Sequence, residues 1–249
     1  MPRRPAREIP RRLVGKQTVK RKGKADPLLG DSWQEWLGII KDHGPMWLYA
    51  ATIISHACCL RITETLMLTA ESFDWYRNVV VVPPLKGQEE TEKVMPSRAV
   101  TLFNDWWRNG GLRVSRMKKQ GNRGIVPVEE TWTWPAQGYL FPATRKDSKL
   151  KRRTKDSVAK QIAKLRKNIT NATIKKEKVR SHSARHRSIN DMKAAGIDHE
   201  VGKQYARIRD DGVWAGYGRL SAFQAGTAMH NNHALQMAWV NAIPGPGNL

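Results

Sequence analysis

The chain has 249 residues, 40% of them hydrophobic, and its 44 Lys and Arg outnumber its 22 Asp and Glu, which gives a formal net charge of +22. This length and apolar share allow a sizeable core and exclude a disordered tail protein. So large a positive charge destabilises a compact chain unless a polyanion neutralises part of it. Nucleic acid is therefore the first partner to expect, and an anionic membrane surface is the second.

Residues 1–26 form a basic leader with ten Lys or Arg, three Pro and no hydrophobic period. This composition predicts a flexible arm, which we extend over residues 1–29. Such an arm suits binding to phosphates, nuclear entry or simple solubilisation, and the sequence does not distinguish these roles.

The first predicted helix begins near Ser32, because Ser32 and Glu35 have the spacing of a capping box. A second helix over 45–59 is apolar on nearly every face and is expected to be central. Its apolar run is short for a bilayer and contains His56, so a buried helix is expected and not a membrane span. A short third helix is predicted over 61–69.

The two cysteines, Cys58 and Cys59, are adjacent and lie in the same apolar run. Neighbouring cysteines rarely form a disulfide, and two thiols cannot complete a zinc site. We therefore expect reduced core residues in a reducing compartment. The sequence opens with no signal-peptide pattern, which predicts an intracellular protein.

Residues 78–84 are a β-branched run and residues 92–97 follow a polar turn, which predicts a β-hairpin with Lys86 at its tip. A helix is predicted over 99–109, where two consecutive glycines end it. Residues 110–138 are predicted to be a long loop-like stretch.

The second half of the chain is predicted to be mainly helical. A basic stretch over 145–155 leads into an amphipathic helix. Its apolar face is formed by Val158, Ile162 and Leu165. A further helix over 181–195 is stopped by Gly196, and a last helix covers about 222–240. Together the elements predict an α+β, mainly α-helical fold with a small antiparallel β-sheet, whose hairpin lies near 79–97.

Several chemically active side chains follow these elements in a defined order. The segments LRITETLML, LKGQEETEKVMPS and HSARH contain most of them. In chain order the residues are Arg61, Glu64, Lys86, His182, Arg185, His186 and Tyr217. This order resembles the catalytic domain of tyrosine recombinases, the phage-integrase-like family, over roughly residues 30–240.

The spacing after Arg185 is the strongest part of the resemblance. In the family a glycine lies eleven residues after the second arginine, and the nucleophilic tyrosine lies about twenty-one residues beyond that glycine. The chain has Gly196 and Tyr217 at these two positions. The fold class above is also the one that the resemblance implies.

The resemblance implies phosphoryl transfer on double-stranded DNA without a metal or another cofactor. Arg61 and Arg185 would bind the non-bridging phosphate oxygens, and Tyr217 would attack to form a 3′-phosphotyrosine. His182 would accept the tyrosine proton, and Lys86 would protonate the leaving 5′ oxygen.

Other residues would support this chemistry or bind the duplex. The supporting residues are Glu64, His186, Arg207 and Arg209. The residues expected to bind DNA phosphates are Lys149, Lys151, Arg152, Arg153 and Lys155.

Two features depart from the family pattern. The family places His or Trp about nine residues before the tyrosine, whereas this chain has Ile208, so Arg207 or Arg209 would have to supply a donor instead. Only the basic arm precedes residue 30, where family members carry a separate helical domain that closes around DNA.

The same residues also have ordinary structural interpretations. Arg61 is placed to cap a helix, Lys86 to keep a hairpin tip soluble and Tyr217 to fill a turn. The alternatives to strand cleavage and rejoining are a non-enzymatic DNA-binding protein derived from a recombinase, a type IB topoisomerase-like enzyme and an RNA-binding protein.

We expect three parts in the chain: the arm over 1–29, a catalytic domain over 30–240 and a tail over 241–249. The last helix resembles the segment by which family members dock on a neighbouring subunit, so a homo-oligomer on DNA is expected. The protein is expected to be located with DNA, in the nucleus if its source is eukaryotic, and to bind no membrane.

Overall fold

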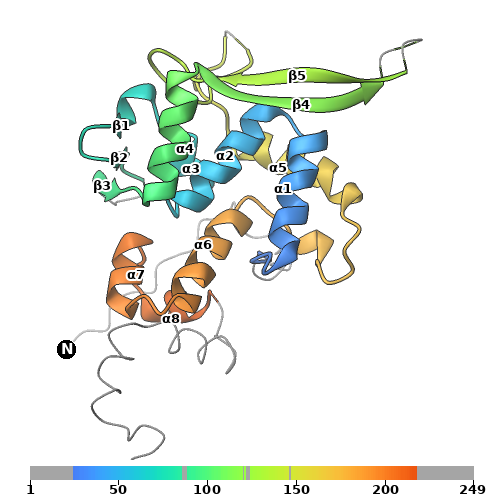
Figure 1. Cartoon of the computed structure of the whole chain (residues 1–249). Coiled ribbons are helices and arrows are strands. Elements are labelled where there is room, and N and C mark those ends of the chain that lie inside the picture. Colours follow the sequence, from blue (N-terminus) through green and yellow to red (C-terminus); the bar gives the residue numbers. More distant parts are fainter. Residues whose placement is uncertain (1–24, 86–88, 120, 122–123, 146, 218–249) are drawn as a thin grey trace, which may run out of the picture.

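The computed structural model of the chain describes residues 25–85, 89–119, 121, 124–145 and 147–217 (Figure 1). Most of the predicted arm, the predicted helix over 222–240 and Lys86 lie outside these residues.

Helix α2 (Met46–Ala57) is the central element, as its all-round apolar sequence predicts. It begins directly after Pro45 and packs against α1 (Asp31–His43) and α6 (Ser183–Ala194). The amphipathic helix α5 (Lys155–Leu165) lies beside α1. Its three apolar residues are all buried, as predicted, and their lysine neighbours face outwards.

The capping box predicted at the start of α1 is wrong. The N-cap is Gly30, and no side chain bonds to the exposed N–H groups of the first turn. The Glu35 carboxylate instead accepts hydrogen bonds from the backbone N–H groups of Thr170 (2.9 Å) and Asn171 (3.1 Å). A tertiary contact thus replaces the local bond that the spacing suggested.

The predicted β-hairpin is present and belongs to a three-stranded antiparallel sheet. Its strands are β1 (Phe73–Asp74), β2 (Val79–Val82) and β3 (Thr91–Val94), in the order β1-β2-β3. The sheet follows the short helix α3 (Ile62–Thr65) and the single turn η2 (Ala70–Ser72). The fold is thus α+β and mainly helical, as predicted.

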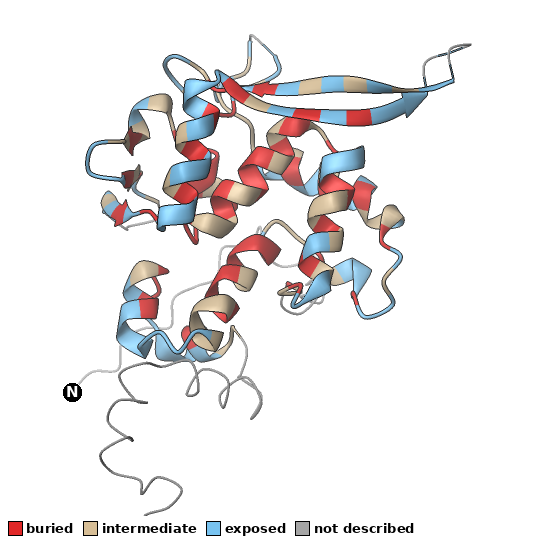
Figure 2. Ribbon diagram, viewed as in Figure 1, coloured by how far each residue is buried: buried red, intermediate tan, exposed pale blue. Residues whose placement is uncertain are grey.

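The loop predicted after helix α4 (Ser97–Arg108) is wrong, because a long two-stranded ribbon occupies this region. Strands β4 (Gly111–Lys119) and β5 (Ile125–Thr133) pair along their full length and extend past α1 and α2 (Figure 1). In β5 half-buried or buried residues alternate with exposed ones along the whole strand, whereas the last three residues of β4 are all exposed (Figure 2). Arg116 and Glu130 occupy two of the inward positions, so the strands lack the purely apolar inward face that identifies a half-buried strand in a sequence.

An aromatic cluster anchors the base of the ribbon. The Trp132 ring stacks on Phe141, with centroids 5.5 Å apart, and meets Trp106 edge-on at 5.8 Å. Trp134 contacts Phe73 in the same way at 5.0 Å. Trp106, Trp132 and Trp134 are buried core residues.

The C-terminal third contains two short helices that the sequence analysis did not predict, α7 (His199–Tyr205) and α8 (Asp211–Ala215). The side chains of Asp198 and Asp210 cap them, so two aspartates before short segments were the missed signal. Helix α6 ends before Gly196, as predicted, and this glycine has a φ of 72°.

A second, smaller apolar cluster holds α6, α7 and α8 together. Its buried members are Cys59, Ile189, Ala206, Ile208 and Trp214. Both cysteines are free and buried, as predicted. Among the helices of the described residues, none has the length and apolar character that crossing a bilayer requires.

Replacement of Gly111 by alanine is predicted to destabilise the base of the ribbon. Gly111 has a φ of 142°, and an added Cβ would overlap the backbone of Trp132 and Thr133. We expect Gly111→Ala to lower the free energy of unfolding by about 1–3 kcal/mol, measured by urea denaturation. Gly38→Ala in α1 is the control, because a Cβ at Gly38 meets nothing within 4 Å. Equal stability of the two variants would contradict the prediction.

Candidate functional site

A buried carboxylate, Glu64 of α3, lies at the centre of the candidate site. Its side chain is 0% exposed and faces three guanidinium groups. The nearest nitrogens of Arg61, Arg207 and Arg185 lie 2.9, 3.4 and 3.8 Å from its oxygens. The structure therefore brings two of the predicted catalytic residues and two of the predicted supporting residues into one cluster.

Arg61 is positioned by the first turn of α3. It is the N-cap residue, and its backbone N–H donates to Glu64 Oε2 at 2.7 Å while its guanidinium donates to Glu64 Oε1 at 2.9 Å. A further bond runs from its Nη2 to the carbonyl of Arg207 at 3.3 Å. About 29% of the Arg61 side chain is exposed, so this residue reaches the surface of the site.

Arg185 comes from the first turn of α6 and is almost completely buried, with 1% of its surface exposed. It donates to the carbonyl of Cys59 at 2.8 Å and to that of Ala206. Its Nε has no hydrogen-bond partner among the described residues. A buried N–H of this kind is costly, and a bound anion is one group able to satisfy it.

Arg207 follows α7 in a left-handed conformation, with a φ of 53°. Its guanidinium donates to Glu64 at 3.4 Å and to the carbonyl of Glu89 at 2.6 Å. Burial lowers the pKa of Arg207, and the Glu64 carboxylate opposes this effect. Arg209, the other predicted donor, is exposed and lines an open cavity of about 430 Å³ with Arg207 and Ile208, outside the cluster.

His182 is the N-cap residue of α6, one turn before Arg185. Its side chain is exposed at the surface of the site, but the surrounding protein removes part of its hydration. This loss of hydration, together with the positive charges of Arg185, Lys155 and Arg61, lowers the pKa of His182 below its ordinary value. The imidazole thus stays neutral to more acidic pH than a free histidine.

Tyr217 packs on α6 through His186, and the two rings meet at a centroid distance of 4.5 Å in an edge-to-face geometry. The carbonyl of Tyr217 accepts a hydrogen bond from the Asn190 side chain at 2.8 Å. The sequence analysis missed Asn190, because no motif distinguishes an asparagine that bonds to a distant backbone. The two rings line an open cavity of about 390 Å³.

Ile208 is buried in the second apolar cluster, beside Ala206 and Trp214. An isoleucine side chain offers no hydrogen-bond donor, so this position contributes packing alone. Trp214 is a buried aromatic residue close by in the sequence, and it packs under Gly202 of α7.

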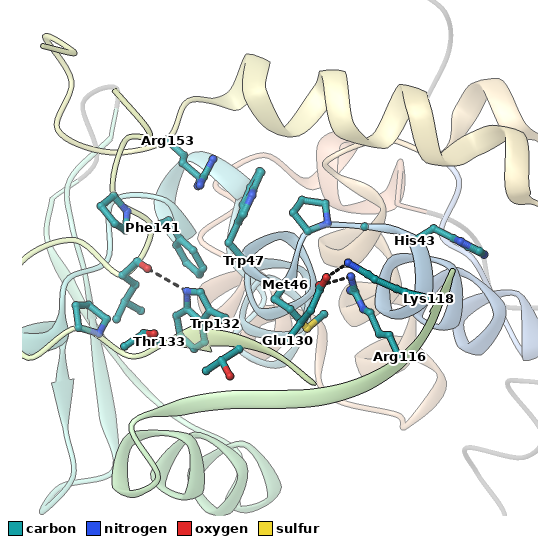
Figure 3. A pocket seen from close by; sticks show the side chains of 16 residues that line it. His43, Met46, Trp47, Arg116, Lys118, Glu130, Trp132, Thr133, Phe141 and Arg153 are labelled. Atoms are coloured by element: carbon teal, nitrogen blue, oxygen red, sulfur yellow. Dashed lines mark hydrogen bonds and ion pairs between the residues drawn. The ribbon is translucent and has the colours of Figure 1, made fainter. Parts of the chain in front are cut away.

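The predicted DNA-binding residues lie between residues 149 and 155, in the segment that leads into α5. Lys149, Lys151 and Lys155 are exposed, and Arg152 and Arg153 are half-buried. Arg153 lies over the Trp47 ring at 4.2 Å and lines a cavity of about 740 Å³ between the ribbon and the start of α2 (Figure 3). Arg153 therefore has a packing role, whereas Lys155 lies close enough to His182 to affect its pKa.

A cluster of possible metal ligands lies on the surface, where side-chain atoms of His199, Glu200 and Asp211 fall within 4.8 Å of one another. The sequence analysis did not find this cluster, because α7 and α8 bring its members together. The Lys203 ammonium group already bonds to both carboxylates, so a cation of the chain occupies this position.

The phage integrase family model matches residues 28–206 of the chain. This match covers more than half of the sequence. The chain belongs to the phage integrase family. No curated protein sequence matches it.

Solved structures of tyrosine recombinases and integrases share the fold of this phage integrase family member. The Tn1549 transposon integrase in complex with transposon right end DNA is 15% identical, with a TM-score of 0.58, and the match covers 84% of this chain and 66% of that one. XerA recombinase is 15% identical, with a TM-score of 0.54 and coverage of 92% and 68%. XerH bound to a palindromic difH substrate is 16% identical, with a TM-score of 0.53 and coverage of 84% and 54%. The match thus covers about two thirds of the Tn1549 integrase and of XerA, and about half of XerH.

Replacement of Glu64 in this integrase-family chain is predicted to destabilise the fold strongly. Glu64→Gln leaves the guanidinium groups around it without their buried counter-charge. We expect a loss of about 2–4 kcal/mol in the free energy of unfolding, measured by urea denaturation.

The matched control is Glu92→Gln, which removes an exposed ion pair with Arg77. Exposed pairs contribute about 0.2–1 kcal/mol, so this variant should unfold almost as the wild type does. A Glu64→Gln variant as stable as Glu92→Gln would show that the cluster does not hold the site together.

Proposed function

We propose that the protein is a tyrosine recombinase that cleaves and rejoins strands of double-stranded DNA through Tyr217, in site-specific recombination or DNA integration. The observation that carries this proposal is the cluster of Arg61, Arg185 and Arg207 around one buried carboxylate. Three guanidinium groups against a single carboxylate leave an excess of positive charge, and an anion is the expected ligand of such a site. A DNA phosphate is the anion that the family and the net charge of +22 favour.

In the proposed cleavage step, the two arginines predicted as catalytic bind the non-bridging oxygens of the scissile phosphate. The Arg61 side chain is partly exposed, and the Nε of Arg185 has no hydrogen-bond partner among the described residues. Both groups are held by backbone carbonyls or by Glu64 before any substrate arrives. Donors that are preorganised in this way stabilise the charge that develops in the transition state.

The Tyr217 oxygen forms a bond to phosphorus while the bond from phosphorus to the 5′ oxygen breaks, which leaves a 3′-phosphotyrosine. His182, whose lowered pKa keeps it neutral, accepts the tyrosine proton. Lys86, which lies outside the described residues, donates a proton to the leaving 5′ oxygen. Rejoining is the reverse of these steps, so the covalent bond preserves the energy that ligation needs.

The position of Ile208 suggests a slower enzyme and not an inactive one. Loss of a single donor to the transition state costs about 2.7–4 kcal/mol. Arg207, the adjacent residue, already contributes positive charge to the cluster. We assign this chemistry to a domain over residues 30–240, with the arm over 1–29 and the tail over 241–249 flanking it.

The decisive experiment uses a nicked suicide DNA duplex, which traps the covalent intermediate because the nicked fragment is lost after cleavage. We expect the wild-type chain to form an adduct that survives denaturation and Tyr217→Phe to form none. Tyr76→Phe is the matched control, since Tyr76 is 97% exposed at the turn between β1 and β2 and should not affect the yield. The target site is unknown, so random-sequence duplexes are included.

The same assay separates the alternative functions. Tight, salt-dependent DNA binding without an adduct would indicate a DNA-binding protein that has lost its chemistry. An adduct together with relaxation of supercoiled DNA, without pairing of two sites, would indicate a type IB topoisomerase-like enzyme. Light scattering on the DNA complex tests the proposed homo-oligomer, which a monomeric complex would contradict.

The pH dependence of cleavage is predicted to follow His182. A base must be neutral to accept a proton, so the rate should fall as the pH decreases through the pKa of His182. Because this pKa is lowered, we expect the midpoint of the acid limb below about pH 6.5, measured by single-turnover cleavage. His182→Gln should remove this limb and leave a lower, flatter profile. A midpoint at or above 6.5 in the wild type would contradict the assignment.

A further inference from the structure

Lys93 of β3 is a buried cation that no motif identified. Lysine is among the residues least often buried, yet only 4% of Lys93 is exposed. Its neighbours Glu92 and Val94 point outwards, so Lys93 occupies the inward position of the strand, where an apolar side chain is expected.

The ammonium group of Lys93 is bound to the end of α2. Its Nζ donates to the carbonyl of Cys58 at 2.5 Å and lies 4.1 Å from the centre of the Tyr205 ring. A cation at this place is favourable, because the last carbonyls of a helix lack partners within it and carry partial negative charge.

The next carbonyl along the chain is bound by a second cation. Arg185 donates to the carbonyl of Cys59 at 2.8 Å, so two consecutive carbonyls are held from two sides, by the β2–β3 hairpin and by α6. Cys59 itself has a φ of 50°, a left-handed conformation that a side chain adopts at a cost. The two cations therefore stabilise a strained turn.

This turn lies two residues before Arg61. Cys58 ends α2, Leu60 leads on to Arg61, and α3 begins at Ile62. The direction in which Arg61 leaves the core depends on the conformation of the turn. Arg185 binds the same turn through the carbonyl of Cys59, so the positions of both arginines of the proposed site depend on this turn.

Lys93 is surrounded by groups from four helices. Burial lowers its pKa to about 8, and the positive charge of Arg185 on α6 acts in the same direction. The thiols of Cys58 and Cys59 at the end of α2 and the carboxylate of Glu64 on α3 oppose this shift. The Tyr205 ring of α7 completes the surroundings.

We propose that Lys93 is a positioning residue for the cleavage reaction, which holds the Cys58–Cys59 turn and thereby ties the β2–β3 hairpin to Arg61 and Arg185. This inference rests on the proposed function, because it assigns a role within the same site. The β2–β3 hairpin and the turn that both arginines depend on are thus linked through one side chain.

The first test measures the turn without any DNA. Cys58 and Cys59 are the only thiols of the chain and both are buried, so their rate of reaction with a thiol reagent reports opening of this turn. We expect Lys93→Met to react at least about tenfold faster than the wild type under native conditions. Lys119→Met is the matched control for lost charge, since Lys119 is an exposed strand residue.

A second control separates local opening from general loss of stability. Phe103→Leu perturbs the aromatic cluster of α4, where the Phe103 ring meets that of Phe73 in β1 edge-on. It should destabilise the fold without faster reaction of the thiols. An increase in Phe103→Leu equal to that in Lys93→Met, or no increase in Lys93→Met, would overturn the proposal.

The final experiment combines single-turnover cleavage of the suicide duplex with DNA affinity. We expect Lys93→Met to cleave about 10- to 100-fold more slowly while its DNA dissociation constant changes by less than about threefold. Lys93→Arg, which keeps the cation, should recover part of the rate. Cleavage by Lys93→Met at the wild-type rate, or a loss of rate that only mirrors a loss of affinity, would overturn the proposal.

The two measurements distinguish failure of this inference from failure of the proposed function. If the wild-type chain forms no adduct, the proposed function fails, and the catalytic part of this inference fails with it. The thiol rates then still decide whether Lys93 holds the turn. If the wild type forms an adduct and the Lys93 variants behave as it does, this inference alone is overturned.

Discussion

The ion cluster around Glu64 is the constraint on which the rest of the structure depends. A buried carboxylate is tolerated only when it is paired, and Glu64 finds its partners on three separate segments: its own helix α3, helix α6 and the residues after α7. Each arginine would in turn be an uncompensated buried or half-buried charge without Glu64. The cluster therefore fixes where α6 and α7 lie relative to the central helix α2. The three arginines carry more positive charge than Glu64 neutralises, so the same cluster that stabilises the fold is suited to bind an anion.

The end of α2 transmits this constraint to the backbone. Helix α2 is apolar and central, and at its C-terminus the chain turns sharply through Cys58 and Cys59 before Arg61 begins the next helix. Carbonyls at this turn face Arg185 and Lys93, while the Cys59 side chain joins the apolar cluster with Ile189, Ala206 and Ile208. Polar and apolar contacts thus meet at one turn. Ile208 is therefore accommodated by packing in this cluster, although it brings no donor to the site.

The β4–β5 ribbon and the basic segment before α5 lie further from this centre (Figure 1). The aromatic cluster under the base of the β4–β5 ribbon is a large part of the main core, and it anchors a ribbon whose outer residues are mostly exposed. The basic segment before α5 is mostly exposed, so its charges are available to a polyanion, except for Arg153, which packs on Trp47. These exposed charges are part of the net charge of +22, whose repulsion a bound nucleic acid would reduce.

The sequence by itself determined the main helices, the β-hairpin, the buried cysteines and the order of the residues proposed for catalysis. Each of these depends on local information: hydrophobic period, turn residues and the spacing of a motif. Only the tertiary structure decided how Arg61, Glu64, Arg185 and Arg207 meet, that Arg209 stays outside, and that Glu35 bonds to residues 170 and 171 instead of capping α1. It also decided that residues 111–119 and 125–133 form a ribbon and that Lys93 is buried. These features depend on contacts between residues far apart in the chain. The free energy of such a contact cannot be read from any short segment of the sequence.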